Sequence, residues 1–255
     1  SACGGTGKCS TCRIEIIDGL GNCSSRSELE QKLSNKLSFP ENIRLACQTT
    51  INGPVSYRRL LLDKRDLSNS NQLANKKLES VGTIRNLSIM FCDIKGFTPF
   101  SEALSAYDVI FILNRYISIM RDIIIRNGGE VNNYIGDAIL AIFGLKESRQ
   151  QTLRAANAGV EMLQAMDEFK GYLSNAYGRD FDMRIGIHYG EVILGSVGFD
   201  EDKKFTVIGD TVNIASRIEG INKESGTRLL ISDVVYERIK EFVDVRNFVR
   251  LKLRG

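Results

Sequence analysis

The stretch LSIMFCDIKGFT, Leu87 to Thr98, and its counterpart YIGDAILAIFG, Tyr134 to Gly144, decide the fold of the larger, C-terminal part of the chain. Each is an apolar run with strand character that a single aspartate interrupts, Asp93 in the first and Asp137 in the second. A carboxylate among apolar neighbours loses hydration, so it needs a hydrogen bond, an opposite charge or a metal ion. Two such aspartates on neighbouring strands predict an oxygen-ligand site for Mg²⁺ or Mn²⁺.

Strand-like and helix-like segments alternate around these two stretches. The order β-α-β-β-α-β predicts an α+β palm, an antiparallel sheet with helices on one face. The predicted elements after the first strand are one long helix over 99–129, a hairpin over 130–144 that turns at Gly136, a helix over 151–169, a hairpin over 183–198, a strand over 205–209, a helix over 210–221 and a last strand over 249–253.

Composition excludes some functions. A chain of 255 residues with 43% hydrophobic content can bury one large core or two modest ones, and a net charge of +3 predicts no nucleic-acid partner. No apolar run approaches the roughly 20 residues that span a bilayer, and no signal peptide opens the chain, which indicates a cytoplasmic protein. We expect sequence to be missing at both ends of the chain. The alternative of a membrane anchor upstream of residue 1 is therefore kept.

The cysteines cluster near the N-terminus. The run CGGTGKCSTC places five residues between Cys3 and Cys9 and two between Cys9 and Cys12, and Cys47 follows at a distance. Three close thiolates and one distant one suit a 2Fe-2S cluster, around which glycines let the backbone wrap closely. A zinc site more often shows two close pairs, and a disulfide framework more often accompanies secretion, so both remain as alternatives.

Residues 1–56 resemble the 2Fe-2S ferredoxins with a β-grasp fold. The resemblance implies that Cys3, Cys9, Cys12 and Cys47 are the cluster ligands, and it leaves Cys23 as an ordinary loop thiol. The first hairpin of that family would lie before residue 1. Residues 57–84 follow as a connection, with a short helix predicted over 73–82, and this connection is either a solvated linker or a transmitter of the cluster's state.

A second group of polar residues lies in the segment DTVNIASRIEG. Asn213 and Arg217 are four residues apart, so they share one face of the predicted helix. Such a pair is weak evidence alone, because most are capping or surface contacts. Its value rises beside two metal-binding carboxylates, since phosphoryl transfer also needs positive donors for the charge that develops on phosphate.

The motifs DIKGFT, YIGDA and VNIASR together make residues 85–255 resemble the class III adenylate and guanylate cyclase catalytic domain. The resemblance implies a head-to-tail homodimer with two active sites at its interface, each binding two divalent ions in one subunit. It assigns metal binding to Asp93, Asp137 and the carbonyl of Ile94, and it assigns ribose orientation and transition-state stabilisation to Asn213 and Arg217 of the other subunit.

The resemblance also assigns the nucleotide contacts. The phosphate-binding turn matches Gly96, Phe97 and Thr98, and Lys252 matches a lysine that contacts the triphosphate. The purine-selecting positions match Asn133 and Thr206. Adenylate cyclases of this family have lysine and guanylate cyclases have glutamate where this chain has Asn133, so this position matches neither. Thr206 fits the many bacterial adenylate cyclases with threonine at its position, and an asparagine amide offers both a donor and an acceptor to adenine, so ATP is favoured, with GTP as the alternative.

Together these features predict an adenylate cyclase that forms cyclic AMP and pyrophosphate and whose activity follows the redox state of a 2Fe-2S cluster, served by an electron donor or acceptor. Two alternatives remain: a degenerate module that binds nucleotide without turnover, and an electron carrier that uses the cyclase-like part as a dimerisation scaffold. The only histidine, His188, is predicted to be structural, and Cys92 is predicted to be a small core residue facing away from Asp93.

Overall fold

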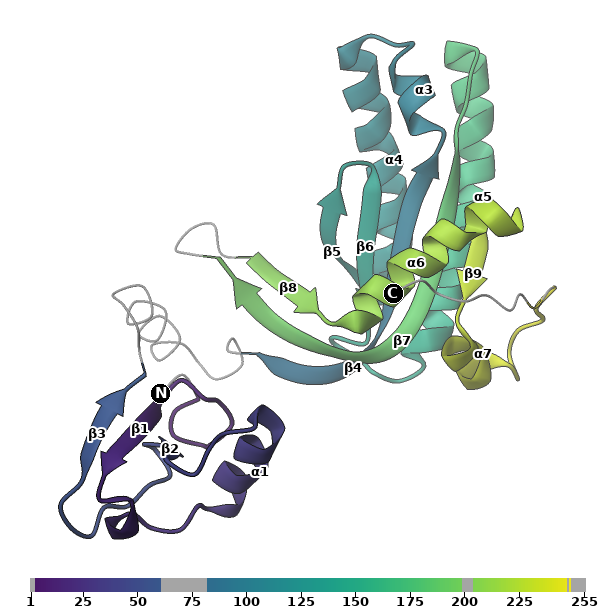
Figure 1. Cartoon of the computed structure of the whole chain (residues 1–255). Coiled ribbons are helices and arrows are strands. Elements are labelled where there is room, and N and C mark those ends of the chain that lie inside the picture. The colour runs from purple at the N-terminus through teal and green to yellow at the C-terminus, as the bar shows by residue number, and fades with distance from the viewer. Residues whose placement is uncertain (1–2, 61–81, 199–203, 247, 249–255) are drawn as a thin grey trace. The chain divides into compact units, whose positions relative to one another are not determined.

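A computed structural model describes residues 3–60, 82–198, 204–246 and 248 (Figure 1). The chain divides into two compact units, Ser1–Thr83 and Ile84–Gly255. The predicted helix over 73–82 lies almost wholly outside the described residues, as do Lys252 and the predicted strand over 249–253. In the part of the chain that is described, no helix is long and apolar enough to cross a bilayer.

The N-terminal unit is a small antiparallel sheet with one α-helix. Its strands are β1 (Arg13–Asp18), β2 (Ile43–Leu45) and β3 (Ser56–Arg59), in the order β2-β1-β3, and its helices are η1 (Leu20–Asn22) and α1 (Glu28–Leu37). Ser27 begins α1, because its hydroxyl accepts a hydrogen bond from the Glu30 amide. Alternation along β1 buries Ile14 and Ile16 on one face.

The C-terminal unit is a six-stranded sheet covered by helices, which confirms the predicted α+β class. The order is β5-β6-β4-β7-β8, and a short strand, β9, pairs with β7 in parallel, so the sheet is mixed rather than wholly antiparallel. The strands are β4 (Thr83–Lys95), β5 (Gly129–Ile135), β6 (Ala138–Phe143), β7 (Asp182–Val197), β8 (Lys204–Ile208) and β9 (Leu229–Ile231). The helices are α3 (Phe97–Ser101), α4 (Ala106–Arg126), α5 (Gln151–Tyr177), α6 (Asp210–Ser225) and α7 (Asp233–Ile239).

Two predicted elements are wrong. Residues 183–198 form no hairpin but belong to one long strand, β7, which pairs with β9 in its first half and β8 in its second. Gly190, within this strand, serves close packing, since a Cβ there would lie 2.7 Å from the Thr211 hydroxyl oxygen. The helix over 99–129 is two helices, α3 and α4, because Ser105 caps α4 by accepting from the Asp108 amide.

Helices cover both faces of the sheet, not one. Met90 and Cys92 of β4 pack against α4 and α5, whereas Leu87 and Ile89 join a second cluster that includes Ala215 of α6. Figure 1 shows α6 crossing the sheet on the side away from α4 and α5. Asp93 alternates with Cys92, so its side chain belongs to the α6 face. The site residues on α6 and the first aspartate therefore share a side of the sheet.

The junction of α6 with β7 is close. A Cβ on Gly186 would lie 2.2 Å from the Glu219 backbone nitrogen and 2.5 Å from the Ala215 carbonyl oxygen, so only glycine fits. The buried amide of Asn222 donates to the Ile185 carbonyl at 3.0 Å. Helix α6 is thereby held at a fixed place on the sheet.

Candidate functional site

The two predicted metal-binding aspartates come from paired strands. Asp93 lies near the end of β4, and Asp137 lies in the turn between β5 and β6, one residue before β6, rather than within a strand. Because Cys92 of β4 pairs with Ile139 of β6, both carboxylates are at the same end of the strand pair. Burial, and then the charge of Asp137, raise the pKa of Asp93.

These two carboxylates suit a divalent ion. Each is only partly exposed, and the repulsion that raises the pKa of Asp93 is relieved when a cation lies between them. Within the described ranges, no three His, Cys, Asp or Glu side chains converge closely enough to hold a metal ion. Two carboxylates, with further positions left to backbone, water and phosphate oxygens, are the usual ligand set for Mg²⁺.

Two residues that the sequence analysis missed lie beside the aspartates. Glu219 of α6 is buried and Arg184 of β7 is partly buried, and Nε of Arg184 lies 3.6 Å from Oε1 of Glu219, too long for a hydrogen bond. The charge of Arg184 opposes the rise in the pKa of Asp93. Burial above all, then Asp93, raises the pKa of Glu219 to about 7. In the sequence, each of these two residues is a single charged residue within a strand-like or helix-like pattern. Many surface residues have the same pattern, so it did not identify them.

The raised pKa of Glu219 makes stability depend on pH. Below its ordinary pKa of 4.5 the carboxyl is neutral in both folded and unfolded chains, whereas above about 7 the folded chain holds a carboxylate that its surroundings disfavour. The contribution of Glu219 to the free energy of unfolding therefore falls as pH rises from about 4.5 to 7. In EDTA, we expect Glu219→Gln to raise the free energy of unfolding at pH 8 by about 2 kcal/mol, after allowance for solvent screening, and to change it little at pH 4.5. Urea unfolding at the two pH values measures this, and an equal effect at both would refute it.

The predicted phosphate-binding turn directly follows β4. Gly96 has φ of 86°, a left-handed conformation that favours glycine, and it precedes the short helix α3. The ring of Phe97 packs edge-on against Phe181, with centroids 6.1 Å apart, so it anchors the turn to the core. Thr98 is exposed on α3. Backbone N–H groups at a helix start are suited to phosphate.

Asn213 and Arg217 both lie on the exposed face of α6. Among the described residues, neither side chain makes a hydrogen bond or an ion pair. An exposed guanidinium and amide on one helix face, on an element fixed to the sheet by Gly186 and Asn222, are positioned to meet a group outside this chain.

The predicted purine-selecting residues lie on the two edge strands of the sheet. Asn133 is exposed on β5, and Thr206 is partly buried on β8, where it pairs with Gly195. Although β5 and β8 are at opposite ends of the strand order, the two strands contact each other. The curl of the sheet therefore brings these two chain segments together, which the sequence did not show.

The predicted cluster ligands lie in two pairs. Cys12 Sγ is 3.4 Å from Cys47 Sγ, and Cys3 is hydrogen-bonded to Cys9. Burial opposes ionisation of Cys3, but hydrogen bonds from Thr6 and Cys9 outweigh it and lower its pKa to about 6. Burial, with the adjacent Cys47, raises the pKa of Cys12 to about 11. Two pairs of thiols fit a 2Fe-2S cluster, in which each iron takes two thiolates.

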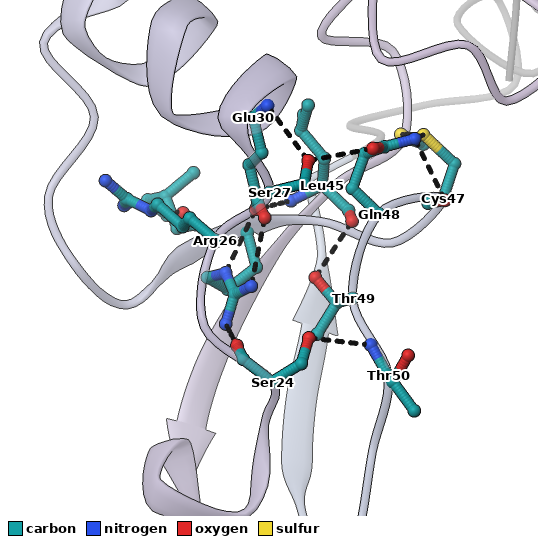
Figure 2. A network of polar contacts seen from close by, with 12 residues as sticks. Ser24, Arg26, Ser27, Glu30, Leu45, Cys47, Gln48, Thr49 and Thr50 are labelled. Atoms are coloured by element: carbon teal, nitrogen blue, oxygen red, sulfur yellow. Dashed lines mark hydrogen bonds and ion pairs between the residues drawn. The ribbon is translucent and has the colours of Figure 1, made fainter.

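Gln48 joins the parts of the chain that surround these thiols (Figure 2). Its Nε2 donates to the Gly5 carbonyl at 2.9 Å and approaches the Cys47 carbonyl at 3.3 Å and the Cys47 sulfur at 3.8 Å. Its Oε1 accepts from the Ser27 hydroxyl at 2.9 Å. One side chain thus connects the N-terminal cysteine loop, the fourth cysteine and the start of α1. The sequence analysis did not single it out.

A buried ion pair supports the strand that leads to Cys47. Glu30 of α1 accepts from Nε and Nη2 of Arg44, each at 2.9 Å, and from the Leu45 amide at 2.7 Å. Figure 2 shows this contact of Glu30 with Leu45 beside the Cys47 loop. Arg44 is 3% exposed, so removing its partner leaves a buried, uncompensated charge.

We therefore expect Glu30→Ala to lower the free energy of unfolding of the N-terminal unit by about 3 kcal/mol. The exposed pair of Arg58 with Glu15 provides the matched control, and Glu15→Ala should cost less than about 1 kcal/mol. Urea unfolding followed by circular dichroism compares the two variants. Similar costs for both would show that the buried pair has no special role.

Two predictions about single residues concern structure only. Cys92 is fully buried in the core beneath β4, which confirms its predicted role. His188 is partly buried, and its Nδ1 hydrogen-bonds the Ser232 hydroxyl at 2.8 Å, which holds β7 to the start of α7. Burial lowers the pKa of His188. This contact agrees with a structural role.

The fold and the site together define a class of protein: an α+β palm with paired acidic residues at a strand end and a polar face of helix α6 exposed, preceded in the chain by a small cysteine-rich domain. Residues 79–255 match the family described as the adenylate and guanylate cyclase catalytic domain, and residues 1–52 match the 2Fe-2S iron-sulfur cluster binding domain. The chain belongs to the adenylate and guanylate cyclase catalytic domain family, with a ferredoxin-type domain before it.

Curated relatives and solved structures agree with this assignment. An adenylate cyclase of Anabaena cylindrica is 40% identical over 61% of this chain and 31% of its own length. Adenylate cyclase 1 of Rhizobium meliloti is 31% identical over 94% of this chain and 37% of its own length. The crystal structure of the guanylyl cyclase Cya2 superposes with a TM-score of 0.63 at 34% identity, over 68% of this chain and 88% of that one. The chain thus spans about a third of the length of these two curated relatives.

Proposed function

We propose that the chain is a class III nucleotidyl cyclase that converts ATP to 3′,5′-cyclic AMP and pyrophosphate at the interface of a homodimer. The single observation that supports this most is the complementary placement of two groups. Asp93 and Asp137 meet at one strand end, while Asn213 and Arg217 lie on a neighbouring helix with no partner among the described residues. One group suits metal ions and the other suits phosphate, which is what phosphoryl transfer requires.

The proposed reaction uses these residues as follows. Asp93, Asp137 and the Ile94 carbonyl would hold two divalent ions, which would supply Lewis acidity toward the ribose 3′-oxygen and the triphosphate. The 3′-hydroxyl gives its proton to solvent water and its oxygen forms a bond to the α-phosphorus, while the bond from that phosphorus to the pyrophosphate oxygen breaks and pyrophosphate leaves. Arg217 of the other subunit donates hydrogen bonds to the α-phosphate oxygens as charge develops, and Asn213 orients the ribose. The Gly96–Thr98 turn and Lys252 contact the remaining phosphates.

Exposed apolar side chains support the homodimer. Ile193 and Val197 of β7 and Ile208 of β8 share one face of the β7–β8 ribbon, since Ile193 pairs directly with Ile208, and each is about half exposed. Tyr134 and Ile135 are exposed on β5. Exposed apolar side chains that share one face of a strand pair suit an interaction site, and a second copy of the chain is the partner that the divided site requires.

The choice of purine is part of the proposal. Asn133 offers both a donor and an acceptor, so it can pair with adenine, though without the charge of a lysine. Both curated relatives above are named adenylate cyclases, whereas the similar crystal structure is of a guanylyl cyclase. We favour ATP and keep GTP as the second substrate to be tested.

Control by a 2Fe-2S cluster is the last part of the proposal. Cys3, Cys9, Cys12 and Cys47 would hold the cluster, and Gln48 would relay a change at Cys47 or Gly5 to α1 through Ser27. One electron from a donor would make the cluster more negative and would strengthen hydrogen bonds to its sulfurs, and loss of that electron to an acceptor would weaken them again. This part stands apart from the chemistry of the cyclase domain.

A cyclic-nucleotide assay tests each part. The chain, reconstituted with iron and sulfide, is supplied with ATP or GTP and with Mn²⁺ or Mg²⁺, in oxidised and dithionite-reduced forms. We expect cyclic AMP in excess of cyclic GMP and a rate that differs between the two forms. Equal rates in both forms would remove redox control alone. Nucleotide binding without any cyclic product would instead favour the non-catalytic module.

A further inference from the structure

A β-bulge in β5 sets the direction of Asn133. Val131 pairs with Ala141 and Asn133 pairs with Leu140, so Asn132 is an extra residue with no partner opposite it. Without the bulge, Asn133 would follow Val131 onto the face that packs against α4 and α5. Because a one-residue shift exchanges the two faces of a strand, the bulge places Asn133 opposite Leu140, on the side of α6.

The bulged residue also connects two strands that are not neighbours in the sheet. Nδ2 of Asn132 donates to the carbonyl of Phe205 in β8 at 3.3 Å. The strands β5 and β8 are the two edges of the main strand order, so this is a side-chain bridge rather than part of the sheet ladder. It joins the residue before Asn133 to the residue before Thr206.

The stability of the fold does not explain why residue 132 has an amide side chain. Its Oδ1 is enclosed, and no donor among the described residues hydrogen-bonds it. Exchanging the amide's oxygen and nitrogen would not help, because it would bring two oxygens together at Phe205. An enclosed acceptor without a donor is destabilising, so an apolar side chain of the same size would cost the fold little.

We propose that Asn132 is a positioning residue for purine selection, which bridges β5 to β8 and so fixes the spacing between Asn133 and Thr206. This inference rests on the proposed function, in which those two residues contact the base. Among the described hydrogen bonds, neither Asn133 nor Thr206 has a side-chain bond that links β5 to β8. The position of Asn133 relative to Thr206 therefore depends on Asn132. Without the bridge, β5 and β8 can move independently. Asn133 and Thr206 are then no longer held at the spacing that fits one purine, so the affinities for the two purines become more alike.

Two variants remove the bridge in different ways. Asn132→Leu replaces the amide with an apolar group of similar size, and Asn132→Asp changes one donor nitrogen to an oxygen that faces the Phe205 carbonyl. Asn22→Asp is the matched control, because Nδ2 of Asn22 also donates to a backbone carbonyl, that of Pro54, at 2.7 Å. Thermal unfolding establishes that each variant is folded.

The measured quantity is the ratio of the Kd values for 3′-deoxy-ATP and 3′-deoxy-GTP in the presence of Mn²⁺. These analogues lack the attacking hydroxyl, so they report base selection even if the chain makes no cyclic nucleotide. We expect both Asn132 variants to move this ratio toward unity by about fivefold, the size of one net hydrogen bond, and the control to leave it within twofold. A purely structural role would weaken both analogues equally. An unchanged ratio in either folded Asn132 variant overturns the inference, whereas absence of cyclic product from ATP and GTP speaks only against the proposed function.

Discussion

Asp93→Asn is expected to lower cyclic-nucleotide formation by about 10³-fold or more. A divalent ion that acts as a Lewis acid contributes several kcal/mol to the transition state, and each 1.36 kcal/mol is a factor of ten in rate. The substitution keeps the size of the side chain but removes the charge that binds metal. Initial rates with ATP across a range of Mn²⁺ concentrations measure the effect, and added Mn²⁺ should restore little of the rate.

Stability separates this effect from misfolding. Burial and Asp137 raise the pKa of Asp93, so the folded chain disfavours its charge, and the asparagine variant should unfold at the same urea concentration as the wild type or a higher one. Asp122→Asn on the exposed face of α4 is the control, with an unchanged rate expected. A folded Asp93→Asn protein with near-normal turnover would remove Asp93 from the metal site.

Arg217→Ala is expected to lower turnover by about 10² to 10³-fold, as for loss of other preorganised donors to a developing oxyanion. Because Arg217 is exposed on α6 and unpartnered among the described residues, its loss should change stability by less than about 0.5 kcal/mol. Arg121→Ala, at an exposed position of α4, is the control. A rise in KM with kcat unchanged would point to ground-state binding instead of transition-state stabilisation.

Mixing the two inactive variants tests whether the site is shared between subunits. If Asp93 of one chain works with Arg217 of another, random pairing makes half of the dimers mixed, and each mixed dimer has one intact site of two. Activity should then return to about a quarter of the wild-type value. If each chain holds a complete site, the mixture will show only the sum of the two residual activities.

The α+β class could be predicted from the sequence because each local pattern agreed with the whole. The apolar runs around Asp93 and Asp137 are strands β4 and β6 with a turn at Gly136, and DTVNIASRIEG is helix α6. The prediction of secondary structure was wrong for two segments, because a glycine or a serine can have more than one structural role. The hairpin predicted over 183–198 is one strand in which Gly190 makes room for Thr211, and Ser105 divides the helix predicted over 99–129 because its hydroxyl caps α4. Local patterns do not state which neighbour a glycine approaches.

The sequence by itself determined the chemistry of this protein: the acids, the amide and guanidinium at helical spacing, and the cysteines at ferredoxin spacing, since each depends on residue type and short-range separation. Only the tertiary structure decided which groups meet across long separations. It placed α6 on the same face as Asp93, added Arg184 and Glu219 beside the aspartates, and curled the sheet until Asn132 reached Phe205. The physical reason is that strand pairing, bulges and sheet curl are fixed by packing over the whole domain, which no short segment encodes.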